Sequence, residues 1–416
     1  MAGRVSRGAS TPGRGFPPGL VERLTRVRRE IHRRPELSNQ EVETTALLRR
    51  ELEASGLTGI RPIGPTGLVA DISVAADGPV VVVRADMDAL PIAEEASVPF
   101  RSQVPGVMHA CGHDAHSAMA LGVAVAARDR LAELPGTLRV IFQPAEETEP
   151  LGGRAVVQGG HLDGVAAAIA LHVNPDIPVG QIGLRSGPTM ASSDEFAITV
   201  CGRSSHAGSP QEGIDAIAVA SAIVQELQKV VTRRVDPRAP VALNIGSIHG
   251  GQAANVVADE VRLQGTIRTL DEESRATVCQ LVGEVAGYVA AAGGATADVE
   301  VTRGEPVLEN HPAVADSFEA AAHRVLGTGS CRWLGRPTIN SEDFAFYAER
   351  VPSAMAWIGV RNEARGIVHP LHHPGFAIDE TVIPLGVELL LNTAAALLED
   401  PPTSAGREGR PASRSG

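Results

Sequence analysis

A cysteine and a histidine stand two residues apart on a glycine-containing turn, in the segment His109-Ala-Cys111-Gly-His113-Asp114. A thiolate and an imidazole at this spacing can face one ion, and both ligand types suit zinc and similar divalent metals. The alternative is a buried structural cysteine beside a helix-capping segment, because free cysteine is among the most buried residue types and Asp114 can act as an N-cap. The segment alone leaves both interpretations open.

Two adjacent carboxylates, Glu146 and Glu147, follow an apolar run and Pro144. Adjacent side chains on an extended segment diverge, so one carboxylate could ligate a metal while its neighbour faces an open cleft as a general base. The alternative is a solvated acidic loop, since Glu149 lies nearby and carboxylates are mostly exposed.

Four histidines lie at positions that suggest chemistry. His172 closes the apolar run 165–171, and His369, His372 and His373 share the proline-flanked loop 368–376. A histidine at the end of a buried strand is often a hydrogen-bonded core residue rather than a ligand. Three imidazoles within five residues are harder to explain by packing, and a solvated loop remains the alternative for at least one of them.

His206 follows Ser205 directly, after a predicted strand. Serine and histidine that are adjacent in sequence do not form a catalytic dyad, because that geometry is spatial, and the alternative for this segment is a simple turn. The sequence contains no Gly-x-Ser-x-Gly elbow, no phosphate-binding loop and no dinucleotide fingerprint.

The elements that position these residues follow from the apolar pattern. Helices are predicted over 20–34, 41–54 and 114–131, and buried strands over 80–84, 138–142 and 166–173. Strand and helix alternation of this kind predicts a mostly parallel sheet covered by helices on both faces, in which ligands gather beyond the carboxyl ends of the strands. Three strands lead directly into polar clusters, which are Asp86-Met-Asp88, Gln143-Pro-Ala-Glu-Glu147 and His172.

The order of predicted strands and helices changes near residue 186. Strands over 196–200, 241–246, 261–267 and 297–301 and helices over 214–231 and 274–292 give the order β-α-β-β-α-β, which is ferredoxin-like. The α/β pattern then resumes with helices over 313–326, from an N-cap at Ser341, and over 381–398. We therefore predict a catalytic domain of residues 20–185 and 303–400, an inserted lid or dimerisation domain of residues 186–302, and disordered tails over 1–19 and 401–416.

Composition excludes several classes of function. The chain has 416 residues and a formal net charge of −12, and an acidic surface repels phosphate backbones, so no nucleic-acid partner is expected. It has no apolar run of 18 residues, so no membrane span is expected, and its first residues lack the apolar region of a signal peptide. Four cysteines against 13 histidines predict reduced thiols, and with them a cytoplasmic location.

Together the motifs closely resemble the metal-dependent amidohydrolases related to hippurate hydrolase, the plant indoleacetyl-amino-acid hydrolases and the bacterial N-acyl-amino-acid deacylases. These belong to the aminoacylase and carboxypeptidase family of dinuclear metallopeptidases. The resemblance spans roughly residues 20 to 400. Its markers are Arg84-Ala-Asp-Met-Asp-Ala-Leu-Pro91, Met108-His-Ala-Cys-Gly-His-Asp114, Phe142-Gln-Pro-Ala-Glu-Glu147, Leu171-His172, Ser205-His-Ala-Gly208, Ser341-Glu-Asp-Phe344 and Leu371-His-His-Pro374.

The resemblance implies a role for individual residues. It implies two divalent ions per subunit (Zn, Mn, Co or Ni), with Cys111 bridging both, His113 and His172 completing one ligand set, and Glu147 and His372 the other. It makes Glu146 the general base and Asp88 the residue that orients a ligand imidazole. His206 would donate to the oxyanion in the partner subunit of a homodimer or tetramer, and Asn255 and Arg268 would hold the substrate carboxylate. Asp86, Glu342, Asp343 and His373 have no role in this prediction.

The activity that the resemblance implies is hydrolysis of N-acyl-L-amino acids, such as hippurate-like, N-acetyl or aryl-acyl amino acids, to a carboxylic acid and a free amino acid. Two alternatives remain at this point. The same site could serve a dipeptidase or aminocarboxypeptidase, or the chain could be a catalytically silent metal-binding relative.

Overall fold

The computed structural model describes residues 16–73, 77–132 and 135–403, so most of both predicted tails lies outside the described residues. The chain forms two compact units. The larger comprises Met1–Gly187, Glu309–Gly335 and Asp343–Gly416, and the smaller comprises Pro188–Leu308 and Arg336–Glu342. The chain therefore changes unit within a few residues of the predicted boundaries at 186 and 302, and the segment 336–342 belongs to the smaller unit.

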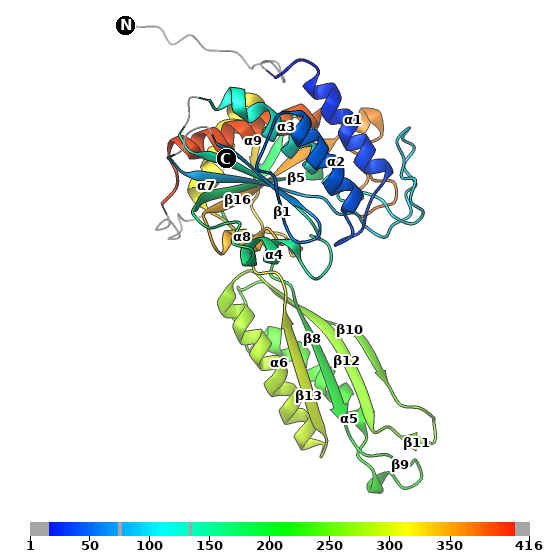
Figure 1. The fold of residues 1–416 in the computed structure, drawn as a ribbon. Helices are drawn as coiled ribbons and strands as arrows, with labels where there is room; N and C mark the ends of the chain where they lie inside the picture. Colours follow the sequence, from blue (N-terminus) through cyan, green and yellow to red (C-terminus); the bar gives the residue numbers. More distant parts are fainter. Residues whose placement is uncertain (1–15, 74–76, 133–134, 404–416) are drawn as a thin grey trace. The chain divides into compact units, whose positions relative to one another are not determined.

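The larger unit is built on an eight-stranded sheet with the order β1-β2-β4-β3-β5-β16-β6-β15 (Figure 1). Its central strands β4 (Thr137–Gln143), β3 (Val80–Asp86), β5 (Val165–Pro178) and β16 (Ser353–Arg361) run parallel. On one side β2 (Leu68–Ser73) and β1 (Arg61–Pro62) pair antiparallel, and on the other β6 (Ile182–Leu184) pairs antiparallel with β16 and parallel with β15 (Cys331–Trp333). This confirms the predicted α/β fold with a mostly parallel sheet.

Helices cover the sheet, and consecutive residues of β3, Val81 to Val83, are fully buried because both of its faces are covered. The main helices are α1 (Leu20–Arg33), α2 (Val42–Ala54), α3 (His113–Arg130), α7 (Pro312–Val325) and α9 (Val382–Glu399), with the short α4 (Gly152–Gln158). In the described part of the chain, α9 alone is long and apolar enough to cross a membrane, but 72% of it is buried, which is how a core helix packs.

The predicted helix capped by Ser341 is wrong. The structure has only a four-residue helix, α8 (Ala345–Ala348), with Phe344 at its N-cap. The Ser341 hydroxyl instead donates to Glu305 (3.2 Å) and accepts from Arg268 (3.4 Å). Its side chain is thus committed to tertiary contacts that local sequence does not reveal.

The smaller unit has the predicted β-α-β-β-α-β order. Its strands β8 (Asp194–Cys201), β10 (Val241–Gly250), β12 (Glu260–Thr269) and β13 (Thr296–Arg303) form an antiparallel sheet with the order β10-β12-β8-β13. Helices α5 (Ala216–Arg233) and α6 (Glu272–Ala292) pack together on one face (Figure 1). The split β-α-β connection, with β12 between β8 and β10, is that of a ferredoxin-like fold.

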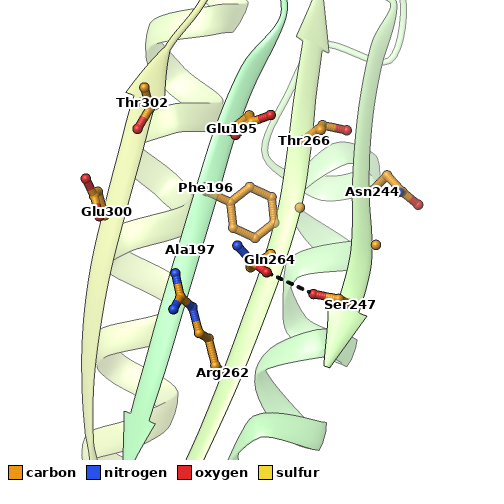
Figure 2. A pocket seen from close by; sticks show the side chains of 12 residues that line it. Glu195, Phe196, Ala197, Asn244, Ser247, Arg262, Gln264, Thr266, Glu300 and Thr302 are labelled. Atoms are coloured by element: carbon orange, nitrogen blue, oxygen red, sulfur yellow. Dashed lines mark hydrogen bonds between the residues drawn. The ribbon is translucent and has the colours of Figure 1, made fainter. Parts of the chain in front are cut away.

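The other face of this small sheet is open and polar. It carries a shallow pocket of about 380 Å³, lined among others by Glu195, Arg262, Gln264 and Glu300 (Figure 2). None of the predicted site residues lines this pocket. Short strands complete the described fold: β9 (Ser205–His206) pairs with β11 (Val256–Val257), and β7 (Gly187–Met190) with β14 (Leu308–Asn310).

Candidate metal centre

The turn that carries Cys111 and His113 is shaped by Gly112. Gly112 has φ of +84°, and a Cβ atom there would lie 2.5 Å from Val173 Cγ2, so only glycine lets the turn pass against Val173 of β5. Helix α3 begins at His113, and the Asp114 side chain does not cap it. Asp114 is instead fully buried and accepts hydrogen bonds from Arg28 Nε (2.7 Å) and His32 Nδ1 (2.8 Å), which tie this turn to α1.

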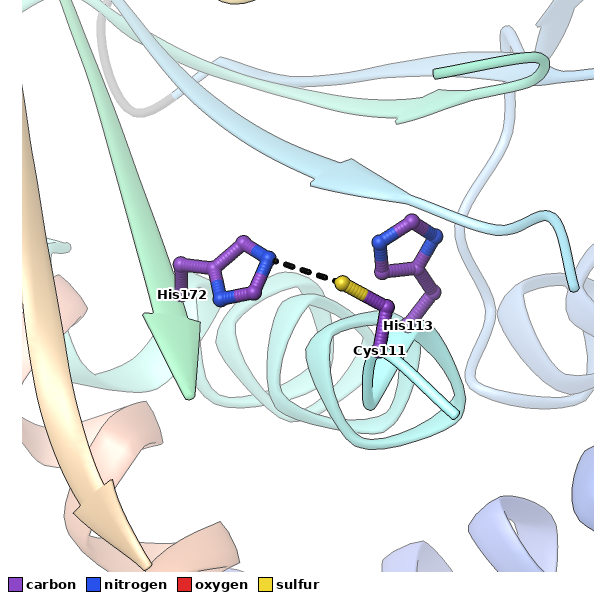
Figure 3. Close-up of side chains that lie close together, drawn as sticks. All are labelled: Cys111, His113 and His172. Atoms are coloured by element: carbon purple, nitrogen blue, oxygen red, sulfur yellow. Dashed lines mark hydrogen bonds between the residues drawn. The ribbon is translucent and has the colours of Figure 1, made fainter. Parts of the chain in front are cut away.

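Cys111, His113 and His172 form the first cluster, in which one potential ligand atom from each residue lies within 4.8 Å of the others (Figure 3). All three are buried, and Cys111 Sγ lies 3.4 Å from His172 Nε2. His172 Nδ1 lies 2.8 Å from the Val173 carbonyl oxygen, which can only accept, so Nδ1 carries the proton. The lone pair of Nε2 is therefore directed toward the thiol.

Cys111, Glu147 and His372 form the second cluster, again within 4.8 Å. His372 Nε2 lies 3.4 Å from Glu147 Oε1, and the His372 backbone has φ of +62° and donates to Ala110 O (2.9 Å). His373 lies elsewhere: its ring stacks on His369 with centroids 4.3 Å apart. The two clusters share Cys111, and together they contain the five residues that the resemblance names as ligands.

The segment that carries the paired glutamates is bent rather than extended, so the expected divergence of Glu146 and Glu147 is wrong. Ala145 has φ of +49°, and its N–H donates to the buried Glu41 carboxylate (2.7 Å). Both glutamates consequently place a carboxylate oxygen within 4.8 Å of a His113 nitrogen. A base and a ligand can thus serve one site from adjacent positions.

Asp88 contacts the ring nitrogen of His113 that faces away from the clusters. Its Oδ1 lies 3.0 Å from His113 Nδ1, while Oδ2 accepts from Ser38 (2.7 Å) and from the Glu147 N–H (3.0 Å). A proton on Nδ1 leaves Nε2 as the available ligand atom, which is the usual arrangement behind a metal-binding histidine.

The chemistry of these donors fits divalent cations. His113 Nε2 is buried without a hydrogen-bond partner among the described residues, and it lies 3.9 Å from Glu147 Oε1, whose other near neighbour is His372 Nε2 at 3.4 Å. Burial and the nearby Glu147 and Glu146 raise the pKa of the Cys111 thiol well above its ordinary value, whereas Asp86 and Asp88 outweigh burial and raise the pKa of His113 to about 10. The carboxylates around Cys111 and His113 would be stabilised by a bound cation. Sulfur, nitrogen and oxygen donors together suit zinc-like ions.

Asp86 and Asp343, which the sequence left without a role, meet through Arg84. The Arg84 guanidinium donates to Asp86 Oδ2 (2.7 Å) and to Asp343 Oδ1 (2.6 Å). Asp343 also accepts from Gln143 Nε2 (2.8 Å) and from the Gly153 N–H (2.7 Å), so it joins the ends of β3 and β4 to the start of α4. Glu342 is buried and belongs to the smaller unit.

Sequence reasoning missed Ser38, Glu41 and His116. Ser38 and Glu41 lie between two helices and give no local signal, because their partners are more than 40 residues away. His116 could have been found, since it lies three residues after His113 on the same helix and therefore on a neighbouring part of its surface.

His206, Asn255 and Arg268 belong to the smaller unit. His206 is exposed in β9, its Nδ1 accepts from the Gly208 N–H (2.9 Å), and the Ala207 N–H donates to Asn255 O (3.0 Å), so His206 and Asn255 occupy one corner. Arg268 lies on β12 and donates to Ile339 O (3.2 Å). Their predicted roles toward substrate remain predictions.

Comparison with known proteins identifies the family. Residues 82–396 match the profile described as Peptidase family M20/M25/M40. An N-acetylcysteine deacetylase of Bacillus subtilis is 40% identical over 384 residues, 91% of this chain and 97% of that protein. A protein named Thermostable carboxypeptidase 2, from Saccharolobus solfataricus, is 36% identical over 366 residues, 87% of this chain and 92% of its own length.

A solved structure agrees. The Bacillus subtilis YXEP protein, described as a dinuclear metal-binding peptidase of family M20, matches with a TM-score of 0.80 and 37% identity, over 92% of this chain and 99% of that one. The fold and the matches define a hydrolase of the metallopeptidase type. The chain belongs to peptidase family M20/M25/M40, which confirms the resemblance seen in the sequence.

Proposed function

We propose that this chain is a metal-dependent amidohydrolase that cleaves N-acyl-L-amino acids to a carboxylic acid and a free amino acid. The observation that carries the proposal is the pair of three-residue clusters sharing Cys111, with Glu146 beside them. The name of the deacetylase relative supports an N-acyl amino acid as substrate. The four cysteines are free thiols, which supports a reducing, cytoplasmic location.

The proposed mechanism assigns the proton transfers to Glu146. Two divalent ions (Zn, Mn, Co or Ni), held by Cys111, His113 and His172 and by Cys111, Glu147 and His372, would supply polarisation of the scissile carbonyl and acidification of water. Glu146 takes the proton of the attacking water and returns it to the leaving amine. Asp88 accepts the proton of His113 Nδ1, so Nε2 is the nitrogen that would bind the ion, which would displace the proton that Nε2 otherwise carries.

His206, Asn255 and Arg268 complete the proposed site. A neutral or charged imidazole donor at the developing oxyanion lowers the barrier, and a guanidinium with an amide suits a substrate carboxylate. The free carboxylate of an N-acyl amino acid thereby finds positive charge despite the acidic surface of the chain.

We also propose that His206 acts in the partner subunit of a homodimer or tetramer. Val256, the register partner of His206, is an apolar side chain that is 43% exposed. An exposed apolar side chain paired with the proposed histidine favours a protein partner at this corner. Mixing inactive His206→Ala subunits with inactive Glu146→Gln subunits should restore part of the activity, and the absence of restoration would argue against action in the partner.

The second candidate function is that of a dipeptidase or carboxypeptidase, which the name of the Saccharolobus relative favours. A hydrolysis panel of hippurate, N-acetyl amino acids and dipeptides, each with added manganese, cobalt, nickel or zinc, separates the two. We expect the acylated amino acids to be cleaved and a matched Glu146→Gln preparation to be inactive. Preference for dipeptides would favour the peptidase, and no cleavage with any of the four metals would favour a silent relative.

A further inference from the structure

His116 is a buried histidine that packs against both ligand histidines of the first cluster. Its ring centroid lies 4.7 Å from that of His172 and 5.5 Å from that of His113, and only 2% of the residue is exposed. Together with Asp86 and His113 it forms a further group with metal-ligating side chains. At this position His116 could either be a further metal ligand or hold the ligand histidines in place.

The hydrogen bonds of His116 exclude it as a ligand. The Val173 N–H donates to His116 Nε2 (2.9 Å), and a backbone N–H can only donate, so Nε2 is the acceptor. Nδ1 therefore carries the proton and donates to Asp86 Oδ1 (2.6 Å). Both ring nitrogens are engaged, and neither has a lone pair left for an ion.

His116 joins two neighbouring strands where their pairing has ended. The ladder between β3 and β5 runs only as far as Arg84 and Ala170, although β5 continues beyond that point beside β16. His172 and Val173 thus follow the last pair, and His116 binds Val173 on one side and Asp86, at the end of β3, on the other. The His116 ring therefore binds the backbone of β5 at a point where β3 no longer pairs with it.

Val173 is also where the His172 ring is fixed. The N–H of Val173 is held by His116, and its carbonyl accepts from His172 Nδ1 (2.8 Å). Asp86 in turn is held by Arg84. The chain of contacts from Arg84 through Asp86, His116 and Val173 therefore sets both the tautomer and the direction of the His172 ring.

We propose that His116, oriented by Asp86, is a positioning residue for His172 and thereby controls occupancy of the cation site at Cys111, His113 and His172. The inference rests on the proposed metal centre. The cluster of Cys111, Glu147 and His372 does not include His172, so loss of His116 should weaken one ion and spare the other. Loss of a partner behind a ligand typically lowers metal affinity 10- to 100-fold.

The test is cobalt titration of metal-free wild-type protein, His116→Ala, His116→Gln and Ser117→Ala, with absorption of the cobalt–thiolate centre and bound cobalt as readouts. Ser117 is the matched control, because it is fully buried on the same helix and donates to the Asp86 carbonyl (3.0 Å) without contacting His172. We expect wild type and Ser117→Ala to bind two ions, and His116→Ala to bind one of them roughly 10- to 100-fold more weakly. His116→Gln should recover part of that loss, since its amide oxygen can accept from the Val173 N–H.

Two results overturn the proposal: wild-type affinity for both ions in His116→Ala, or an equal loss in Ser117→Ala. If His116→Ala does not fold, the same comparison is made with His116→Gln, and wild-type affinity and absorption for both ions there also overturn it. Wild-type protein that binds no cobalt would instead refute the proposed metal centre itself, so the two failures are distinguishable.

Discussion

The buried ion pair between Arg275 and Asp194 gives a sharp prediction for the smaller unit. Asp194, at the start of β8, is fully buried, and Arg275 on α6 donates to both of its oxygens (Nε–Oδ2 2.8 Å, Nη2–Oδ1 2.6 Å). The Gly304 N–H, just after β13, also donates to Asp194 (3.2 Å). Arg275→Met would leave this carboxylate buried with one backbone donor and the weak donor Cys279 (3.7 Å).

The loss of stability expected for Arg275→Met depends on the burial of the ion pair rather than on its N–O distance. Removing one partner of a buried pair costs about 3–5 kcal/mol, because the remaining charge stays desolvated. Arg238 and Asp236 provide the control: their N–O distance is also 2.6 Å, but their side chains are 89% and 47% exposed. Arg238→Met should therefore leave the stability unchanged, since water screens such a pair and replaces it.

Hydrogen exchange of the β8 and α6 amides is a suitable assay, because it reports opening of this unit separately from the larger one. Arg275→Met should raise the opening constant roughly 100- to 4,000-fold, which is the stated energy at 1.4 kcal/mol per tenfold change. Adding Asp194→Leu should recover much of the loss, because an apolar pair has no stranded charge. A change under about 1 kcal/mol in Arg275→Met, or an equal change in Arg238→Met, would show that burial does not set the strength of this ion pair.

Three further predictions concern the larger unit. Glu146→Gln should retain its metal while kcat falls about 10²- to 10⁴-fold, and a wild-type kcat would reject Glu146 as the base. Cys111→Ala should lose both ions in elemental analysis and His372→Ala only one, because only Cys111 belongs to both clusters; full occupancy in Cys111→Ala would contradict this. Asp71→Asn should lower the free energy of unfolding by about 1 kcal/mol at pH 7, because Arg139 donates to that carboxylate at 2.7 Å. Burial raises the pKa of Asp71, but the hydrogen bond from Arg139 outweighs burial, so the net shift of this pKa is downward. In urea unfolding curves, the stability difference between wild type and Asp71→Asn should therefore shrink as the pH falls from about 4 through the folded-state pKa. A stability difference that does not depend on pH would exclude the ion pair as its cause.

The fold class and the family could be predicted from the order of residues alone. Apolar runs such as 80–84 and 166–173 predicted parallel strands because a strand buried on both faces has little polar surface to interrupt it. The change in the order of predicted strands and helices near residue 186 predicted the ferredoxin-like insertion. The motifs between Arg84 and Pro374, in their order, carried the resemblance to the family, and the family match over residues 82–396 confirms it.

The way in which the site side chains meet depends on contacts that exist only in the folded chain. The resemblance already named His372 rather than His373 as the ligand, but its cause is visible only in the fold: the backbone at His372 is left-handed and its ring lies against Glu147, while His373 stacks on His369. The convergence of Glu146 and Glu147 depends on the bend at Ala145, which is held by Glu41 more than 100 residues earlier in the chain. Such contacts join residues that are distant in sequence, so no local pattern of residue types encodes them.

His116 shows the same division. Its residue type and its spacing from His113 are plain in the sequence, and both are compatible with a further metal ligand. Its role changes once the structure shows a backbone N–H at one ring nitrogen and a carboxylate at the other. The early end of the ladder between β3 and β5 creates that backbone donor, and strand register is a property of the folded sheet rather than of the chain.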